Sequence, residues 1–464
     1  MMRRLQAILL IVLVSIYAST ASAQETPAKP SVFIEVRADR EDAIYKVGET
    51  ITFRVTALTC TVSGNNAVKA KDATPVEGVK LAYRITGDGG MEKAGEIVSA
   101  LTPVTVECSL DRPGFVLCAV GETALSRWWQ YKGRGGAGVD PLKIEAGVTK
   151  PADFDAFWSE SLAELRKVSM DGTTSEKVES PDDKVEVYKI KVPSLGVGPD
   201  NIHPVVTGHL CKPAGAAPRS CPAILRLPGA GVRSSRPGIA DASRFGMISL
   251  TISAHGIEVG QPDAYYAEQR EPISNLYKIG GADKAEALRN SYYRTIFMRV
   301  ARALEYLKSL PEWDGKTLII SGGSQGGGLS LIGAGLDPQV TACIANYPGF
   351  CDQYGYLKQK PNGWPQMIRL DKDGKPQNPM MVETAAYFDA ANFALRINID
   401  TVVTTGFIDT TCPPSSVYAA YNLIPSVNKR IITSPNNGHE GPPWDQAAFI
   451  EQHLANMKAQ AADH

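Results

Sequence analysis

The sequence predicts two folded units: a small β-sandwich, and after it an α/β domain whose mainly parallel sheet is flanked by helices. Three observations support this prediction. The chain has 464 residues, and at roughly 150 residues per domain this length favours two or three units. Residues 31–130 contain short alternating segments separated by turn residues, which is typical of a sandwich. From residue 146 to 464, short runs rich in Val, Ile and Leu alternate with helical patterns, which favours a parallel sheet.

The first 23 residues have the pattern of a signal peptide. Arg3 and Arg4 precede the apolar run 7–16, and the small residues Ala21-Ser22-Ala23 form an A-x-A cleavage pattern. An uncleaved membrane anchor is the alternative, whereas a lipoprotein anchor is not favoured because no Cys lies near the cleavage site. We therefore expect a periplasmic or secreted protein with no stable membrane insertion after cleavage.

The overall composition is that of a globular protein. Hydrophobic residues make up 44% and charged residues 21% of the chain, which excludes a wholly disordered, collagen-like or coiled-coil protein. Lys and Arg number 48 and Asp and Glu 49, for a formal net charge of −1. No basic excess or polybasic run indicates nucleic acid or an anionic membrane as a partner.

Export would permit disulfides, and the chain has eight cysteines. Sequence alone cannot fix their pairing, although neighbours such as Cys211 with Cys221 and Cys343 with Cys351 are reasonable pairs. None has C-x-x-C spacing, so zinc or thioredoxin-like chemistry is not favoured.

The strands of the predicted sandwich follow one another closely. The first lie on either side of a turn at Gly48, and further strand-like segments occupy residues 78–90, 95–110 and 114–123. The Gly-rich stretch Gly133–Gly138 interrupts this pattern and is interpreted as part of a linker, residues 131–145, or as a loop beside the active site. A phosphate-binding loop is not favoured because no Lys-Ser/Thr follows.

The α/β unit opens with a helical pattern at 153–168, with Asp153 as its early cap. A second long helical pattern covers residues 293–310. The predicted strands are at 184–194, 222–230, 247–254, 317–324, 340–348 and 401–409.

One of these strands runs into the motif Gly322-Gly323-Ser324-Gln325-Gly326, and an apolar helical pattern follows. This is G-x-S-x-G in the strand–turn–helix context of an α/β-hydrolase fold. The glycines suit a crowded, strained turn that exposes the Ser324 hydroxyl. Ser324 is therefore the predicted nucleophile, and the Gln325 amide at the helix N-terminus is a predicted oxyanion donor. A tight structural turn is the alternative.

A serine nucleophile needs a base and an orienting acid, which follow in the order acid, then His, in this fold. His439 lies in a loop just after a strand, whereas His453 lies in an amphipathic helical pattern and is expected at a surface or interface. Asp409 follows the strand at 401–407 and is the predicted acid. Asp400 precedes that strand and would lie at the wrong edge of the sheet.

The second oxyanion donor is expected from the small residues Pro228-Gly229-Ala230-Gly231, which follow another strand. Small residues allow the backbone to approach a substrate oxygen closely. The amide of Ala230 is the predicted donor, although Gly-rich turns also follow strands for ordinary structural reasons.

Residues 150–455 resemble the acetyl xylan esterase / cephalosporin C deacetylase family of carbohydrate esterases. The matching segments, in order, are PADFDAFW, SGGSQGGG, YFDAANFALRINI, GFIDTTCPPSSVYAAYN and NNGHEG. This resemblance implies that Ser324 is the nucleophile, Asp409 orients and His439 is the base, with oxyanion amides from Gln325 and Ala230. It also implies an acetylated carbohydrate substrate, no cofactor and homo-oligomers.

Two positions depart from the family pattern. Family members usually have R-G-Q where this chain has Ala254-His255-Gly256-Ile257, and a Tyr where Ala230 stands. His255 is therefore either a substrate contact or a replacement for a structural Arg.

The segment 353–381 is aromatic, Pro-rich and expected to be irregular. Trp364, Tyr354 and Tyr356 would form a sugar-stacking cap, or the segment would be a packed insertion at a subunit contact. Asp371–Gly374 is interpreted as a solvated turn rather than a calcium loop, and no metal site is expected.

These observations predict an exported serine esterase that removes O-acetyl groups from carbohydrate, such as acetylated xylan or xylo-oligosaccharides, through an acetyl-enzyme. Action on another ester or a peptide bond is the nearest alternative, because the same triad performs both reactions. A third hypothesis is a carbohydrate-binding protein whose hydrolase domain is inactive. The sandwich itself would bind glycan or serve packing.

Overall fold

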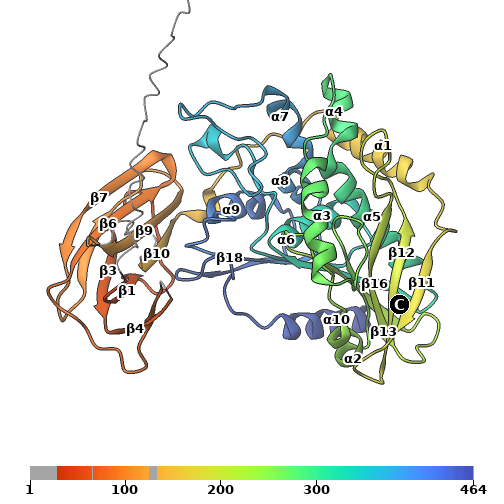
Figure 1. Ribbon diagram of the computed structural model, residues 1–464, viewed down its shortest axis with the longest axis horizontal. Helices are drawn as coiled ribbons and strands as arrows, with labels where there is room; N and C mark the ends of the chain where they lie inside the picture. Colours follow the sequence, from red (N-terminus) through yellow and green to blue (C-terminus); the bar gives the residue numbers. More distant parts are fainter. Residues whose placement is uncertain (1–28, 65, 125–132, 463–464) are drawn as a thin grey trace, which may run out of the picture.

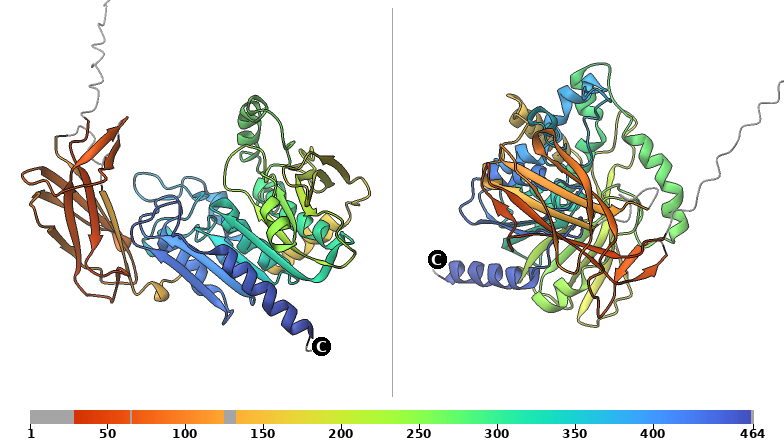
Figure 2. Two further views of the ribbon diagram at one scale, coloured as in Figure 1. Left: turned by 90° about the horizontal axis from the view of Figure 1, so that it is seen from below. Right: turned by 90° about the vertical axis from the view of Figure 1, so that its left-hand side faces the viewer.

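The structure is a computed structural model that describes residues 29–64, 66–124 and 133–462. It contains a β-sandwich at one end and a larger α/β domain beside it (Figures 1 and 2). The predicted signal peptide, residues 1–23, lies outside the described residues. Among the helices of those residues, none is both long enough and apolar enough to span a bilayer.

The sandwich consists of two sheets that face each other across an apolar core. The strands of one sheet, in spatial order, are β1 (Phe33–Ala38), β3 (Ile51–Leu58) and β8 (Val104–Cys108). The other sheet has the order β2 (Ile44–Tyr45), β10 (Gly133–Val139), β9 (Gly114–Glu122), β6 (Lys80–Gly87) and β7 (Met91–Val98). A separate hairpin joins β4 (Cys60–Ser63) to β5 (Asn66–Lys69). Alternate residues such as Phe53, Leu81 and Ile85 are fully buried, as the period-2 pattern predicts.

The interpretation of residues 131–145 as a linker is wrong for Gly133–Val139. These residues form β10, which pairs antiparallel with β9 and parallel with β2. Glycines occur here because neighbouring segments pack so closely against both faces of the strand that a Cβ would collide with them. A Cβ at Gly133 would lie 2.2 Å from the Ile34 carbonyl oxygen, and one at Gly136 would lie 2.6 Å from Phe407 of the α/β domain. The sandwich therefore extends to residue 139.

The α/β domain is built on one nine-stranded sheet, which confirms the predicted fold class. The strands β15, β14, β16, β17, β18 and β19 are parallel to one another, whereas β13 pairs antiparallel with β15, and β12 and β11 continue antiparallel at the other edge. The order across the sheet is β11 (Thr174–Val178), β12 (Val185–Pro193), β13 (Val205–Pro213), β15 (Ile248–Ile252), β14 (Cys221–Leu227), β16 (Trp313–Gly323), β17 (Ala342–Asn346), β18 (Asp400–Gly406) and β19 (Lys429–Ser434).

Helices cover both faces of this sheet (Figure 1). Ile319 of β16 belongs to an apolar cluster with Phe449 and Ile450 of α10 (Gln446–Ala462). Its neighbour Ile320 belongs to the main core, which includes α5 (Tyr292–Ser309) and α6 (Gln325–Leu336). The remaining helices are α1 (Phe154–Arg166), α2 (Ile239–Phe245), α3 (Asp263–Leu276), α4 (Lys284–Asn290), α7 (Pro379–Thr384), α8 (Ala390–Ala394) and α9 (Pro414–Leu423), with short 3₁₀ turns at Asp88–Gly90, Pro141–Lys143, Gly355–Lys358 and Ala385–Phe388.

The two domains pack directly against each other. Phe115 of β9 is buried and makes an edge contact with Phe407 and a tilted contact with Tyr418, with ring centroids 4.9 and 5.4 Å apart. The Gly136 amide donates a 3.2 Å hydrogen bond to the Pro435 carbonyl oxygen. Phe407 directly follows β18 and Pro435 directly follows β19. The sandwich therefore contacts the segments that follow two neighbouring strands of the parallel sheet.

Candidate active site

The turn between β16 and α6 presents Ser324 in a strained conformation. Its φ is 58° and its ψ −122°, outside the regions that L-residues ordinarily occupy. The flanking glycines make this turn sterically feasible. A Cβ at Gly322 would lie 2.5 Å from the Gly326 main chain, and one at Gly326 would lie 2.2 Å from the Leu227 carbonyl oxygen.

The structure brings Ser324, His439 and Asp409 together. The Ser324 hydroxyl oxygen lies 2.8 Å from Nε2 of His439, and Nδ1 of His439 lies 2.9 Å from Oδ2 of Asp409. With a proton on Nδ1 donated to the carboxylate, Nε2 is free to accept the serine proton. The Asp409 side chain is buried, whereas about a third of the His439 side chain is exposed. This geometry has the connectivity required for nucleophilic acyl transfer.

Asp409 is held in place by its own loop. Its Oδ1 accepts hydrogen bonds from the amides of Thr411 and Cys412, at 2.8 and 2.9 Å. The other oxygen, Oδ2, is thereby directed at His439. Asp400 lies at the opposite end of β18, as its position before the strand predicts.

His453 is not at a surface, so the expectation for this residue is wrong. Only 5% of it is exposed, and its Nε2 lies 3.0 Å from the Thr341 hydroxyl. Its Nδ1 lies 3.3 Å from Asp400. These two contacts, with Thr341 and Asp400, hold α10 against the edge of the sheet opposite Ser324, His439 and Asp409.

The loop that carries His439 is fixed by side-chain hydrogen bonds. Glu440 accepts from the Gly438 amide at 2.9 Å and from the Asn437 side chain at 3.1 Å. Tyr347 places the edge of its ring against the imidazole, with centroids 5.2 Å apart. Sequence reasoning missed Tyr347 and this role of Glu440. The position of Tyr347 directly after β17, at the carboxyl edge of the sheet, was the signal available.

Gln325 and the loop that contains Ala230 both lie near Ser324. Gln325 is the first residue of α6, so its amide lies at the positive end of the helix dipole. The loop after β14 reaches the same place, because a Cβ at Gly229 would be 3.9 Å from Cβ of Ser324. Arg233 donates a 3.0 Å hydrogen bond to the Ala230 carbonyl, which orients the peptides of this loop.

His255 is buried, and it lies 2.6 Å through Nδ1 from the Tyr292 hydroxyl. Burial, together with the positive charge of Arg299, lowers the pKa of His255 to about 4, so the ring is neutral at neutral pH. Arg299 itself donates hydrogen bonds to the carbonyls of His203, Val205 and Ala254. The ring also lines the cavity described next, and a role in substrate binding stays a prediction.

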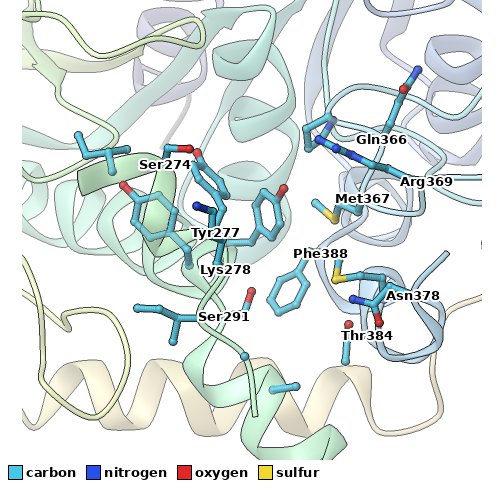
Figure 3. A pocket seen from close by; sticks show the side chains of 18 of the residues that line it. Ser274, Tyr277, Lys278, Ser291, Gln366, Met367, Arg369, Asn378, Thr384 and Phe388 are labelled. Atoms are coloured by element: carbon cyan, nitrogen blue, oxygen red, sulfur yellow. The ribbon is translucent and has the colours of Figure 1, made fainter. Parts of the chain in front are cut away.

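A cavity of about 1020 Å³ is lined by Gln325, the residue that follows Ser324 in the chain. Figure 3 shows the side chains of its walls. Its lining includes Ala230, Gly231 and Gln325 near the nucleophile. One wall comes from α3, α4 and the start of α5, and the other from the insertion 350–384. This volume exceeds what an acetyl group requires, so the cavity can hold a larger ligand next to the Ser324 turn.

Of the three aromatic residues predicted to form a sugar-stacking cap, only Trp364 lines the cavity. Trp364 is half-buried against Phe350 and lines the cavity. Tyr354 is buried and donates a 2.6 Å hydrogen bond to the Val382 carbonyl, and Tyr356 packs against the core outside the cavity lining. Sugar stacking by Trp364 stays a prediction.

The suggested disulfides are not present. All eight cysteines are free, including Cys211, Cys221, Cys343 and Cys351. Cys211 and Cys221 lie on β13 and β14, which are separated in the sheet by β15, and this explains why neighbours in sequence are not partners.

Within the described residues, one group of three side chains has metal-ligating atoms close together. Atoms of Asp409, Cys412 and His439 all lie within 4.8 Å of one another. Asp409 and His439 are the two residues already hydrogen-bonded in the Ser324 arrangement.

The chain is similar to several known proteins. Residues 142–457 match the model of the acetyl xylan esterase family. The chain is 31% identical over 444 residues to the acetyl esterase Axe7A of Xylanibacter ruminicola, covering 94% of this chain and 93% of that relative. Two solved structures are also similar. An acetyl xylan esterase from Paenibacillus sp. R4 is 26% identical, with 68% of this chain and 98% of that one covered and a TM-score of 0.55. Acetyl xylan esterase 1 from Thermoanaerobacterium sp. JW/SL YS485 shares the fold, with 24% identity, coverages of 68% and 97%, and a TM-score of 0.55.

Proposed function

The chain belongs to the acetyl xylan esterase family of carboxylic ester hydrolases, and we propose that it removes O-acetyl groups from carbohydrate, such as acetylated xylo-oligosaccharides. We further propose that Ser324, His439 and Asp409 are its catalytic triad. The observation that carries the proposal is the continuous chain of hydrogen bonds from Ser324 through His439 to Asp409, at 2.8 and 2.9 Å.

In the first half of the reaction, Nε2 of His439 accepts the Ser324 proton while the serine oxygen attacks the acetyl carbonyl carbon. Asp409 stabilises the imidazolium that forms. The amides of Gln325 and Ala230 stabilise the oxyanion of the tetrahedral intermediate. The C–O bond to the sugar then breaks, and the sugar hydroxyl leaves with the proton from His439.

In the second half, water attacks the acetyl-enzyme. His439 takes a proton from the water and returns it to Ser324, and acetate is released. This series of reaction steps needs no cofactor, because the side chains supply every proton transfer. The signal-peptide pattern further supports the proposal that this reaction takes place in the periplasm or outside the cell.

The test is acetate release from acetylated xylo-oligosaccharides by the wild-type protein and by Ser324→Ala. Release by the wild type alone, with several orders of magnitude lost in Ser324→Ala, is the expected result. Unchanged activity in a folded Ser324→Ala protein would remove Ser324 from the mechanism. Hydrolysis of p-nitrophenyl acetate without release from the oligosaccharide would keep the esterase and overturn the carbohydrate substrate.

A further inference from the structure

The cavity beside Ser324 has a strong charge bias. Three cationic residues line it: Arg270 on α3, Lys278 just after α3, and Arg369 on the insertion. Within the described residues, its lining contains no Asp or Glu. This bias is local, because the whole chain has almost equal numbers of acidic and basic residues.

These three cations have no carboxylate partner in the part of the chain that the structure describes. Lys278 donates a 2.6 Å hydrogen bond to the neutral Asn275 side chain. Elsewhere on the domain, by contrast, Arg294 pairs with Glu164 and Lys308 with Asp337. Cations without partners on the wall of a cavity are free to pair with a ligand.

The cations face one another across the cavity. Figure 3 shows Lys278 on one side and Arg369 on the other. The positive charge of Arg369 reaches the Tyr293 phenol, where it opposes the rise in pKa that burial causes. Because Tyr293 also lines the cavity, this charge acts inside it and not only on the outer surface.

The cavity that the cationic groups line extends to the residue next to Ser324. Gln325, directly after Ser324, and Ala230, in the loop after β14, line the same cavity as Arg369 and Arg270. A ligand that presents an acetyl ester to Ser324 therefore extends toward positive charge.

We propose that the preferred substrate is an acetylated oligosaccharide that carries a carboxylate, namely a uronic acid residue near the acetylated sugar. This inference rests on the proposed deacetylase function. Arg369 and Arg270 present planar forks that match a carboxylate, and Lys278 adds a point charge. All three side chains are exposed, so each contributes modestly and salt weakens the contribution.

The experiment uses one acetylated xylo-oligosaccharide with a glucuronic acid branch in two forms, the free acid and its methyl ester. The two differ by one charge and share every acetyl group. The free acid is expected to have a kcat/KM about tenfold higher at low ionic strength, equivalent to about 1.4 kcal/mol, and this ratio is expected to fall at high salt.

Variants locate the origin of the preference. Arg369→Gln and the double variant Arg270→Gln/Lys278→Gln are each expected to lower the acid-to-ester ratio severalfold. The matched control is Lys372→Gln, an exposed cation three residues from Arg369 and outside the cavity lining, which is expected to leave the ratio unchanged.

Equal rates on the free acid and the methyl ester would overturn the inference and leave the deacetylase standing. A preference that survives in both cavity variants would overturn the role of these three residues. Release of acetate from neither form, with p-nitrophenyl acetate still hydrolysed, would overturn the proposed function and this inference with it.

Discussion

Gly136→Ala tests whether the sandwich helps to position Asp409, the proposed acid of the triad. Gly136 lies on β10, and the added Cβ would be 2.6 Å from both Cβ and the carbonyl oxygen of Phe407. It would also be 2.7 Å from the Phe407 carbonyl carbon. Two of these three atoms belong to the main chain, so a rotamer change cannot relieve the contact.

The size of the effect follows from these distances. Carbon atoms in contact settle at about 3.5–4.0 Å, so β10 and the Phe407 segment must separate by about 1 Å. Asp409 is two residues beyond Phe407, and its hydrogen bond to His439 is 2.9 Å long. A misplacement of about 1 Å in an active site can cost about 100-fold, or ~3 kcal/mol of transition-state stabilisation. Overpacking also costs about 1–3 kcal/mol of stability.

The measurement is kcat for p-nitrophenyl acetate together with urea unfolding. Gly135→Ala is the matched control on the same strand, since its Cβ would be 2.9 Å from Val36 within the sandwich. It should lose stability while keeping most of kcat. Gly172→Ala, whose Cβ meets only Pro193 at 3.4 Å, should change neither. If Gly136→Ala retains wild-type kcat, the sandwich does not set the position of Asp409.

Three further predictions concern the triad, a buried histidine and the thiols. Asp409→Asn should lower kcat by about 10³–10⁴-fold with an unchanged circular dichroism spectrum; a loss below tenfold would contradict its role in orienting His439. His255 is neutral in the folded protein, with a pKa of about 4, but takes up a proton below pH 6.5 once unfolded. The free energy of unfolding of the wild type should therefore fall as pH drops from 6.5 towards 4. In urea unfolding, His255→Asn should lose about 2–3 kcal/mol less over the same pH range. An identical pH dependence in the two proteins would refute the role of His255. Because all eight cysteines are free, the denatured, unreduced protein should react with eight equivalents of a thiol reagent, and dithiothreitol should leave Tm unchanged; fewer equivalents would indicate disulfides.

The fold of the α/β domain was predictable because its signals are local. Short apolar strands alternate with helical patterns, and the central strands are buried on both faces, as Ile319 and Ile320 illustrate. The role of Gly133–Val139 was not predictable in the same way. Glycine has low strand propensity, and the reason for it here is the approach of Ile34 and Phe407, which are distant in sequence.

The same distinction applies to the site. Ser324 is marked by its own turn, and Asp409 and His439 each follow a strand of a parallel sheet, so topology brings them to one edge. Arg369 comes from an insertion without regular periodicity, so nothing in the sequence predicts that it faces Lys278 across a cavity. His453 was misjudged because its burial depends on Thr341, which directly precedes β17, and on Asp400 at the start of β18, and both are far from it in the chain.

The three proposed catalytic residues differ in what holds them. Ser324 is fixed within the α/β domain, where Gly322 and Gly326 pack against neighbouring main chain. Asp409 and His439 lie on loops whose first residues, Phe407 and Pro435, contact the sandwich through Phe115 and Gly136. A disturbance of the interface between the domains would therefore act on the acid and the base, and leave the strained serine turn intact. Such a disturbance should impair proton transfer to His439 before it impairs the fold around the nucleophile.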